Sequence, residues 1–507
     1  MYDYVIVGAG SAGCVLANRL SADPKSRVLL LEAGGPDTAR EIHVPAAFSK
    51  LFKTAADWAY YTDEQPCLND RKLFWPRGKV LGGSSSINAM IYICGNRRDY
   101  DRWAESGAAG WNWSSIDHYF ERTLRNLNVC GLRTVNPISS AFVEAAVGAG
   151  FLRNEDFNDR EQDGFGFYRV TQQNGQRHSA AAAFLHPEKR ANLIVLTGAF
   201  VTRVLLEGLR ARAVEYVRDG KTEQATAERE VILAGGAINS PQLLMLSGIG
   251  PADHLRGLGL NVAVDLPGVG RNLQDHPVLP VCYRATRPIS LANATSFPNV
   301  ARYMLWKKGP LASNVAECGG FVRTRPGLDR PDLQFHFAPG FFLEHGFRTV
   351  AGHGFTVGPT LVTPQSRGFI RLRSSDPTHS PQIQPRYLEA ESDLRVLVEG
   401  IRIGREIIKS KAMDKVRGDE LFPGATAISD AELIGYVCGT AESLYHPAGT
   451  CKMGVDEMAV VDPQLCVRGT ERLRVVDASV MPEIVTGNTN APTMMIAEKA
   501  ADMIAAG

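Results

Sequence analysis

The apolar positions in the first 32 residues form two short, continuous runs, at residues 4–7 and 28–31. Between them lie a glycine-rich stretch at residues 8–13, GAGSAG, and a segment with helical spacing of apolar residues up to Leu20. Continuous apolar runs of this length are typical of strands buried on both faces of a parallel sheet. The pattern therefore predicts a strand, a tight turn, a helix and a second, parallel strand.

The glycine spacing in this turn is that of a dinucleotide-binding fingerprint. Gly8 would allow the turn itself, Gly10 the close approach of the backbone to a pyrophosphate, and Gly13 the close packing of the helix on the strand. The first helical residues, Ser11 and Ala12, would offer unpaired N–H groups to the phosphates. A purely structural turn could use the same glycines, so the turn alone does not establish a cofactor site.

An acidic residue, Glu32, closes the second apolar run, and Ala33 follows it. Glu32 lies 24 positions after Gly8, close to the ~20-residue spacing at which a carboxylate binds the ribose hydroxyls of an adenine dinucleotide. An acid at this position also disfavours a 2′-phosphate. The N-terminal segment therefore predicts a site for FAD or NAD without choosing between them.

Later apolar runs predict that distant parts of the chain complete the first sheet. Residues 192–197 and 230–234 are strand-like, and a glycine pair and a helix expected to begin near Ser240-Pro241 follow the second run. Residues 393–410 repeat apolar residues at helical spacing, which predicts a long amphipathic helix.

Two other stretches, residues 141–183 and about 281–439, show a different pattern. They contain short alternating runs, such as residues 333–337 and 368–373, separated by proline and glycine. Alternation of this kind is typical of antiparallel strands. We expect these stretches to form a second sheet.

Composition and charge narrow the function classes. The 507 residues are 44% hydrophobic and carry 55 basic against 54 acidic side chains, so no strong field exists to attract nucleic acid. The nine cysteines lack metal-ligand spacing, which favours free thiols in a reducing compartment and no metal site. The N-terminus does not resemble a signal peptide and no apolar stretch approaches ~18 residues, so we expect a cytoplasmic protein. Peripheral contact with the inner membrane stays open. We expect a monomer or a homodimer.

Four stretches carry a resemblance to a known family. Residues 76–90, PRGKVLGGSSSINAM, would present neighbouring N–H groups and hydroxyls that suit a phosphate or the edge of a ring system. Together with residues 235–250, 268–276 and 444–493, this run resembles the signatures of the GMC (glucose–methanol–choline) oxidoreductase family, most closely the bacterial choline and aliphatic-alcohol dehydrogenases. The resemblance spans essentially the whole chain, and it implies FAD rather than NAD.

The resemblance also implies an α/β fold, α+β overall, in which each domain is assembled from separated parts of the chain. A Rossmann-like FAD-binding domain would comprise residues 1–140, 184–280 and 440–507. A substrate-binding domain, whose antiparallel sheet roofs the flavin, would comprise residues 141–183 and 281–439.

The family pattern further implies where FAD binds. The adenosine is expected beside Glu32, and a helix N-terminus after Pro492 would stabilise charge on the flavin ring. Some relatives attach FAD through a histidine where this chain has Ile87, so non-covalent binding is expected. Beyond the turn residues, Glu32 and Ala33, the expected cofactor-binding residues are Arg77, Gly82, Gly83, Ser84, Asn88, Ala89, Met90, Val201, Asp477, Ala478, Asn490, Ala491, Pro492 and Thr493.

By the same resemblance, a histidine and an asparagine meet at the flavin face, here His446 and Asn490. A neutral imidazole, with an unperturbed pKa of ~6.5, is suited to take the hydroxyl proton of an alcohol while FAD accepts the hydride. Asn490 could hold the alcohol oxygen without competing as a base. His276 is expected to be structural, near the pyrophosphate.

Three residues are candidates for substrate contact. Glu317 could hold a quaternary ammonium group such as that of choline, whereas an aromatic roof would favour longer apolar alcohols. Phe335 and His336 are the other two candidates, although strand alternation places them on opposite faces.

The expected function is therefore the FAD-dependent oxidation of a primary alcohol to the aldehyde, with electrons passed to a quinone-type acceptor. Three alternatives stay open: an oxygen-using oxidase, a choline dehydrogenase and a non-redox lyase on the same fold.

Two departures from the family pattern bear on activity. Cys94 stands where many relatives carry arginine, and residues 125–136 look shortened.

Overall fold

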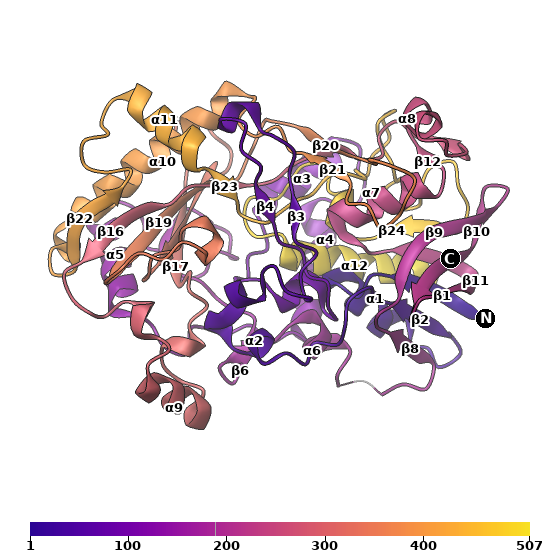
Figure 1. Cartoon of the computed structure of the whole chain (residues 1–507), viewed down its shortest axis with the longest axis horizontal. Helices are drawn as coiled ribbons and strands as arrows, with labels where there is room; N and C mark the ends of the chain where they lie inside the picture. Colours follow the sequence, from indigo (N-terminus) through magenta and orange to yellow (C-terminus); the bar gives the residue numbers. More distant parts are fainter. Residues whose placement is uncertain (188, 507) are drawn as a thin grey trace.

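The computed structural model describes residues 1–187 and 189–506. Two large sheets lie at opposite ends of the molecule, and helices and loops join them (Figure 1). Both chain termini lie at the end formed by the first sheet (Figure 1). The mixed α/β architecture is the one predicted.

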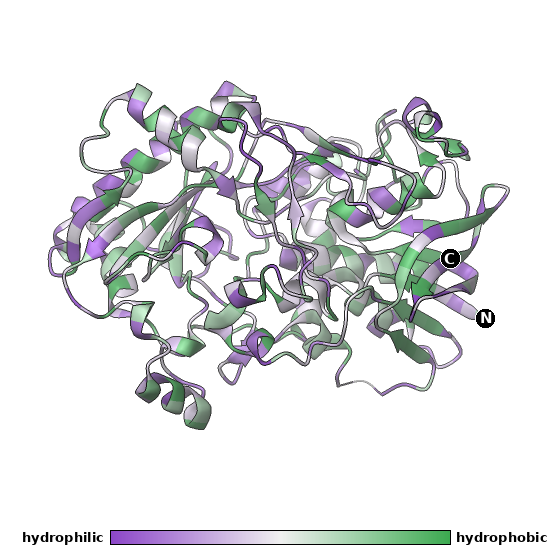
Figure 2. Ribbon diagram, in the orientation of Figure 1, coloured by the Kyte–Doolittle hydropathy of each residue, from purple (hydrophilic) through white to green (hydrophobic). Residues whose placement is uncertain are grey.

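The first sheet has a parallel core in the order β8-β2-β1-β11-β24. β2 is buried throughout, as an unbroken apolar run requires in a parallel sheet with both faces covered, and Figure 2 shows both β2 and β8 as hydrophobic. The predicted return of residues 192–197 and 230–234 to this sheet is confirmed. The strands are β1 (Tyr2–Val7), β2 (Val28–Leu31), β8 (Leu193–Leu196), β11 (Lys221–Leu233) and β24 (Leu473–Val475).

The long strand β11 joins this core to an antiparallel meander. Its first half pairs with β10 (Arg210–Arg218), which pairs with β9 (Phe200–Glu207), while its second half pairs in parallel with β1. α7 (Gly236–Leu246) follows β11 directly and packs on β9. The glycine pair after β11 therefore opens a second strand-to-helix turn beside the first.

The second sheet is antiparallel, in the order β22-β16-β19-β18-β17-β5. α5 (Pro137–Gly148) and α10 (Glu391–Lys409) pack against it, and the predicted helix at residues 393–410 is confirmed. Gly400 lets α10 lie close, since a Cβ there would be 2.7 Å from Pro359 of β19. The strands are β5 (Gly164–Phe167), β16 (Val281–Ala285), β17 (Cys318–Val322), β18 (Leu333–Ala338), β19 (Gly354–Leu361) and β22 (Arg417–Phe422), with the short β15 (Pro277–Val278) and β23 (Glu442–Ser443) at one side.

One predicted strand lies elsewhere. Residues 368–371 form β20 (Gly368–Arg371), but this strand pairs with β14 (Arg271–Leu273) and β21 (Gln382–Gln384) in a separate three-stranded sheet. Alternation predicted the strand correctly and could not identify its partners, because pairing depends on where the flanking segments lead.

The other elements are short or lie outside both large sheets. The remaining helices are α1 (Ser11–Leu20), α2 (Arg40–His43), α3 (Arg97–Glu105), α4 (Trp113–Leu124), α6 (Ala180–Phe184), α8 (Ala252–Gly257), α9 (Phe297–Trp306), α11 (Asp430–Thr440) and α12 (Asn490–Ala506). The remaining strands are β3 (Tyr60–Tyr61), β4 (Phe74–Trp75), β6 (Gln172–Gln173), β7 (Gln176–Arg177), β12 (Ile249–Gly250) and β13 (Val264–Asp265).

The helix expected near Ser240-Pro241 begins earlier, at Gly236, so Pro241 lies inside α7. A proline within a helix cannot donate an N–H to the carbonyl four residues before it, here Ala237. The hydroxyl of Thr450 donates to that carbonyl instead, at 2.6 Å. A distant segment thus replaces the missing hydrogen bond, which local sequence could not indicate.

The N-terminal helix α1 and the C-terminal helix α12 pack side by side, in the part of the molecule that holds the first sheet. α12 contacts both α1 and α4. Its Glu498 is fully buried and forms ion pairs with Arg19 of α1, at 2.7 Å, and with Arg122 of α4, at 2.6 Å. One carboxylate therefore ties three helices together.

Because removing one partner from a buried ion pair leaves uncompensated charge, we expect Glu498→Gln to lower the free energy of unfolding by ~3–5 kcal/mol. The midpoint of denaturant unfolding is the measurement. Asp502→Asn is the matched control: Asp502 also pairs with Arg122 but is half exposed, so its loss should cost less than ~1 kcal/mol. Equal effects of the two substitutions would contradict the role given to Glu498.

Candidate active site

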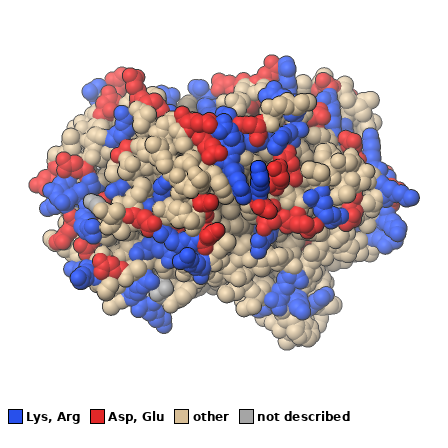
Figure 3. Space-filling model, turned by 180° about the vertical axis from the view of Figure 1, so that it is seen from behind, with Lys and Arg blue, Asp and Glu red and all other residues tan. Residues whose placement is uncertain are grey.

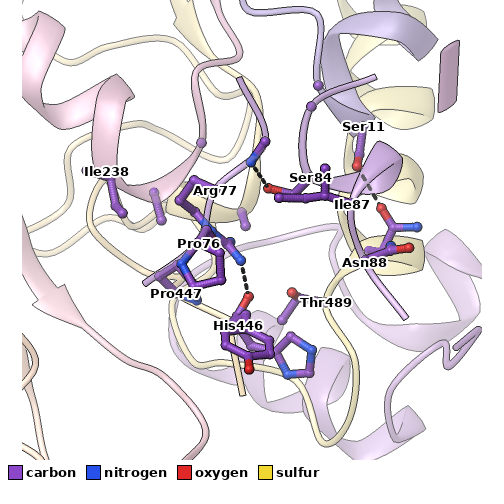
Figure 4. Close-up of a pocket in the computed structure, with 18 of the residues that line it drawn as sticks. Ser11, Pro76, Arg77, Ser84, Ile87, Asn88, Ile238, His446, Pro447 and Thr489 are labelled. Carbon is purple, nitrogen blue, oxygen red and sulfur yellow. Dashed lines mark hydrogen bonds between the residues drawn. The ribbon is translucent and has the colours of Figure 1, made fainter. Parts of the chain in front are cut away.

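A long cavity reaches from the β1–α1 turn of the first sheet to β18 and β19 of the second. Figure 4 shows Ser11, Ser84 and Ile87 on one side of it and Arg77 with His446 on the other. Segments far apart in the sequence therefore meet at one site, as the resemblance implied.

The β1–α1 turn forms one end of the cavity. Gly8 has a φ of +100°, and a Cβ on Gly13 would lie 1.9 Å from the Gly8 carbonyl oxygen, so both positions require glycine. A Cβ on Gly10 would meet no atom within 4 Å, because this residue faces the cavity. α1 begins there without a side-chain cap, which leaves its first N–H groups open to an anion.

The carboxylate of Glu32 is fixed beside this turn. One oxygen accepts a hydrogen bond from the Ala9 N–H at 2.9 Å and the other accepts one from the Gly34 N–H at 2.8 Å. Burial raises the pKa of Glu32 to about 7, although these hydrogen bonds favour the charged form. Each oxygen keeps a lone pair for a further donor such as a ribose hydroxyl.

Side-chain hydrogen bonds hold the serine-rich loop in a short 3-10 helix, η3 (Gly83–Ser86). The Ser85 hydroxyl donates to the Gly82 carbonyl and the Ser86 hydroxyl to the Leu81 carbonyl, so these two side chains hold the loop, while Ser84 lines the cavity. The Oδ1 of Asn88 accepts from the Met90 N–H and from the buried Arg177 guanidinium. Arg177 lies outside every motif that we recognised in the sequence.

Asp477 lies in the opposite wall of the cavity. Its carboxylate accepts hydrogen bonds from the Ser240 hydroxyl at 2.6 Å and from the Gly236 N–H at 2.8 Å. Burial raises the pKa of Asp477 above its usual value. These contacts join the start of α7 to the residues that were expected near the diphosphate.

Most of the expected cofactor-binding residues line the cavity. The exceptions are Gly13, Gly82, Ala491 and Pro492, which do not line it. The residues in the lining are Gly8, Gly10, Ser11, Ala12, Glu32, Ala33, Arg77, Gly83, Ser84, Asn88, Ala89, Met90, Val201, Asp477, Ala478, Asn490 and Thr493.

His446 lies at the far end of the cavity, held by a buried carboxylate. Asp275 accepts a hydrogen bond from the His446 N–H at 2.7 Å, and from the Ser443 and Tyr387 hydroxyls. Arg77 donates to the Tyr445 carbonyl at 2.5 Å, which fixes the preceding residue. The backbone of the histidine is therefore anchored on both sides.

The asparagine beside His446 is Asn488, which corrects the expected pairing with Asn490. The His446 Nε2 lies 3.2 Å from the Asn488 amide nitrogen. Asn490 instead begins α12, and its Oδ1 accepts a hydrogen bond from the Ser11 hydroxyl at 2.6 Å. The two asparagines are two residues apart, and they make different contacts because α12 begins at Asn490.

Two other histidines, both buried, also lie near His446. The Nδ1 of His276 is 3.0 Å from the Nδ1 of His446, so His276 belongs to this end of the cavity, which corrects its expected place near the pyrophosphate. His336 lines the cavity, and its Nδ1 contacts Thr360 at 3.1 Å. Its Nε2 has no hydrogen-bond partner among the described residues.

Burial controls the protonation of these rings. It lowers the pKa of His446 well below its usual value, and the neighbouring His276, His336 and Arg77 lower it further. Burial likewise lowers the pKa of His276 and of His336 to about 3. All three imidazoles are therefore neutral at physiological pH.

The cavity wall around His446 is largely apolar, and two of the expected substrate residues are not part of it. Phe335 faces the opposite side of β18, where its ring packs against Phe165. The carboxylate of Glu317 is buried and accepts hydrogen bonds from the Ser139 and Ser313 hydroxyls and the Asn136 N–H. Residues that do line this end are Phe48, Phe52, Val278, Leu279, Val315, Phe342, Glu442, Leu444 and Tyr445.

The donor set fits FAD. The uncapped helix N-terminus and the open face of Gly10 suit a diphosphate, and Glu32 suits the adenosine ribose. Ile87 lines the cavity and offers no nucleophile for a covalent bond to the flavin.

Comparison with known proteins agrees with this reading. The sequence profile described as GMC oxidoreductase matches residues 2–278 in its N-terminal part and residues 364–497 in its C-terminal part. The alcohol dehydrogenase [acceptor] of Pseudomonas putida is 47% identical over 527 residues, covering 99% of this chain and 96% of the relative. The mitochondrial choline dehydrogenase of Homo sapiens is 46% identical over 531 residues, covering 99% and 89%.

Solved structures show the same fold. Pyridoxine 4-oxidase from Mesorbium loti superposes with a TM-score of 0.91 at 32% identity, over 99% of both chains. Formate oxidase from Aspergillus oryzae superposes with a TM-score of 0.94 at 29% identity, over 100% of this chain and 98% of that one. The chain therefore belongs to the GMC oxidoreductase family of FAD-dependent enzymes that act on CH–OH groups.

Proposed function

We propose that the protein oxidises a primary alcohol to the aldehyde, with His446 as the general base. The observation that carries this proposal is a neutral, partly buried imidazole whose Nε2 lies beside the Asn488 amide in the wall of the cavity. When bound, FAD supplies the hydride acceptor. The residues around His446 need only position the hydroxyl group and take its proton.

Hydrogen bonds around His446 support a defined tautomer. The Gln334 amide donates to the Asn488 Oδ1 at 3.4 Å, which turns the Asn488 amide nitrogen toward His446. If that nitrogen donates to Nε2, the His446 proton resides on Nδ1 and is donated to the His276 Nδ1. The Nε2 lone pair then accepts from Asn488, and a bound alcohol hydroxyl would take over as its donor.

An alcohol oxygen that bound against both groups would replace their contact with each other. Its proton would pass to the His446 Nε2, while the Asn488 N–H would donate to the oxygen as negative charge develops there. The His276 Nδ1 would accept from the charged imidazole and so offset part of the cost of burying it.

Asn490 has a separate proposed role at α1. Its side chain pairs with Ser11 at the start of that helix, where the diphosphate is expected. The N-terminus of α12 would then face the flavin, as the helix-dipole argument requires.

We expect His446→Ala to slow reduction of bound FAD by alcohol by ~10²–10⁴-fold and Asn488→Ala by ~10²–10³-fold, because each removes a group that acts on the reacting oxygen. Asn490→Ala is the matched control, which should lower FAD occupancy with a smaller effect on the rate per bound FAD. Anaerobic stopped-flow absorbance measures the rate, and FAD released by denaturation measures occupancy. Protonation of His446 should abolish its action as a base, so kcat/KM should fall at low pH. Because the pKa of His446 is lowered, the midpoint of that fall should lie below pH 6.5. The assignment of Asn488 in place of Asn490 would be overturned if Asn490→Ala slowed FAD reduction at full FAD occupancy while Asn488→Ala left the rate unchanged.

The lining around His446 supports alcohols with apolar tails. Phe48, Phe52 and Phe342 contribute aromatic surface, and Val278 and Leu444 contribute aliphatic surface. Burial of each methylene in such a wall would contribute ~0.8 kcal/mol. The one carboxylate at this end among the described lining residues is Glu442, and burial raises its pKa to about 7, which makes it a weak anchor for a fixed cation.

We expect kcat/KM to rise from ethanol through hexanol to octanol and to exceed that for choline and for glucose. Steady-state assays with a dye acceptor are the measurement, and Glu442→Gln is the control, since it should leave the trend among uncharged alcohols intact. A flat trend, or a preference for choline that Glu442→Gln abolishes, would show that the carboxylate sets the substrate instead.

The electron acceptor is proposed to be a quinone rather than oxygen. Leu444 lines the cavity two residues before His446, and in this proposal its side chain would add bulk where oxygen approaches the bound flavin. The similarity to an alcohol dehydrogenase [acceptor] supports the same choice.

After anaerobic reduction with alcohol, we expect an added quinone to restore the flavin absorbance faster than air does. Leu444→Ala should narrow that difference, since it opens the approach to the ring. Rapid peroxide formation in air, equimolar with aldehyde and not lowered by quinone, would instead identify an oxidase. No loss of flavin absorbance with any alcohol would favour the lyase alternative.

A further inference from the structure

The helix α9 has an unusual distribution of side chains, because its apolar face is turned to solvent. Phe297, Ala301 and Leu305 follow one another at a spacing of four residues, which places them on one side. Phe297 is 85% exposed and Leu305 is 70% exposed, whereas Tyr303 is the only buried side chain of the helix. Figure 1 shows α9 projecting from the body of the molecule.

Further apolar side chains extend this face. Met304 is 49% exposed and Trp306, at the end of the helix, is 60% exposed. Single exposed apolar residues are common on protein surfaces, but four large ones within ten residues form a patch that calls for a partner. We call Phe297, Met304, Leu305 and Trp306 the α9 patch.

Basic side chains border the α9 patch. Arg302 and Lys308 are exposed, and Lys307 lies over the Tyr303 ring. Two further arginines reach the helix from other segments: the Arg40 guanidinium contacts the Met304 sulfur and the Arg133 guanidinium donates to the Trp306 carbonyl.

Acidic side chains are missing from the same part of the chain. No aspartate or glutamate occurs between Asp275 and Glu317. Seen from behind, the projecting lobe at the lower right shows basic and uncharged atoms and no acidic ones (Figure 3). The local charge is thus strongly positive although the whole chain has a net charge of only +1.

We propose that α9 docks on the surface of an anionic phospholipid bilayer. An apolar helix face with tryptophan and phenylalanine would enter the interface between headgroups and acyl chains, while the basic side chains would bind the anionic headgroups. The projecting, convex form of α9 favours a deformable lipid surface over a protein partner, which would need a matching groove. No helix among residues 1–187 and 189–506 is long and apolar enough to cross a membrane, so the proposed contact is peripheral.

Co-sedimentation of the FAD-loaded protein with vesicles tests this proposal. Vesicles of phosphatidylcholine with phosphatidylglycerol should bind the protein, and vesicles of phosphatidylcholine alone should bind it at least tenfold more weakly. Raising the salt concentration should weaken the binding to anionic vesicles, because surface charges are screened. Equal binding to both kinds of vesicle, or no binding, would overturn the proposal.

Leu305→Glu tests the apolar contact and should weaken binding by tenfold or more, because it removes buried apolar area and adds repulsive charge. Ile428→Glu is the matched control. Ile428 is 75% exposed and precedes α11, which Figure 1 shows on the opposite side of the molecule from α9. Both variants should keep the FAD content and the unfolding midpoint of the unaltered protein, since neither side chain is buried. Equal loss of binding in both would overturn the proposal.

Lys308→Glu tests the charge and should weaken binding to anionic vesicles at low salt more than at high salt. A second copy of this chain could cover the α9 patch instead of a bilayer. The mass of the unaltered protein in solution, measured by light scattering, tests for such a dimer. A dimer that Leu305→Glu converts to a monomer, without vesicle binding by either form, would show a protein interface in place of a membrane surface.

Discussion

The hydrogen bond between Ser11 and Asn490 joins the starts of two helices that lie 479 positions apart, and the remainder of the site is built around that junction. α1 can begin there only because Gly8 and Gly13 let it pack against β1. α12 is held beside it by Glu498, whose carboxylate pairs with arginines of both α1 and α4. Helix packing thus brings two N-termini, each with unpaired N–H groups, to the same cavity.

The position of His446 follows from a second constraint, which is that buried polar groups need partners. Asp275 satisfies three donors, including the His446 backbone N–H, and so fixes the loop that carries the ring. The ring itself lies among neutral or basic groups, and burial keeps it unprotonated. The result is an imidazole that is neutral at physiological pH, and among the described residues no carboxylate contacts its ring nitrogens. In the proposed mechanism, His276 takes the place that a carboxylate often has beside a catalytic histidine, and it adds no negative charge to this end of the cavity.

The local pattern of apolar residues predicted the helices and strands well. It predicted poorly which of these elements contact one another. The β1–α1 turn, the strands at residues 192–197 and 230–234 and the helix at residues 393–410 followed from periodicity, because each has its apolar pattern within a few residues. The start of α7 did not follow from periodicity. The hydrogen bond that Pro241 removes from this helix is replaced by one from Thr450, in a distant segment. Arg177 and Gln334 also escaped notice, because a lone polar residue in a strand or loop carries no signal of the partner that it orients.

The second sheet shows why the substrate residues were the least predictable. Alternation correctly separated Phe335 from His336, but it could not say which face of β18 meets the cavity. α5 and α10 cover the face that carries Phe335, so the polar residues Gln334 and His336 face the site and the phenylalanines become core.

The apolar surface around His446 comes instead from segments outside β18, including Phe48, Phe342 and Val315. Val315 follows α9 and the short helix η5 (Pro310–Ala312), which packs on α9. If α9 docks on a bilayer, the segment that closes the apolar end of the cavity would lie close to the lipid surface. An apolar alcohol and a lipid-soluble quinone would then both be most concentrated near the same end of the cavity. This gives one physical reason for an apolar substrate pocket and a membrane-facing helix to lie at the same end of the molecule.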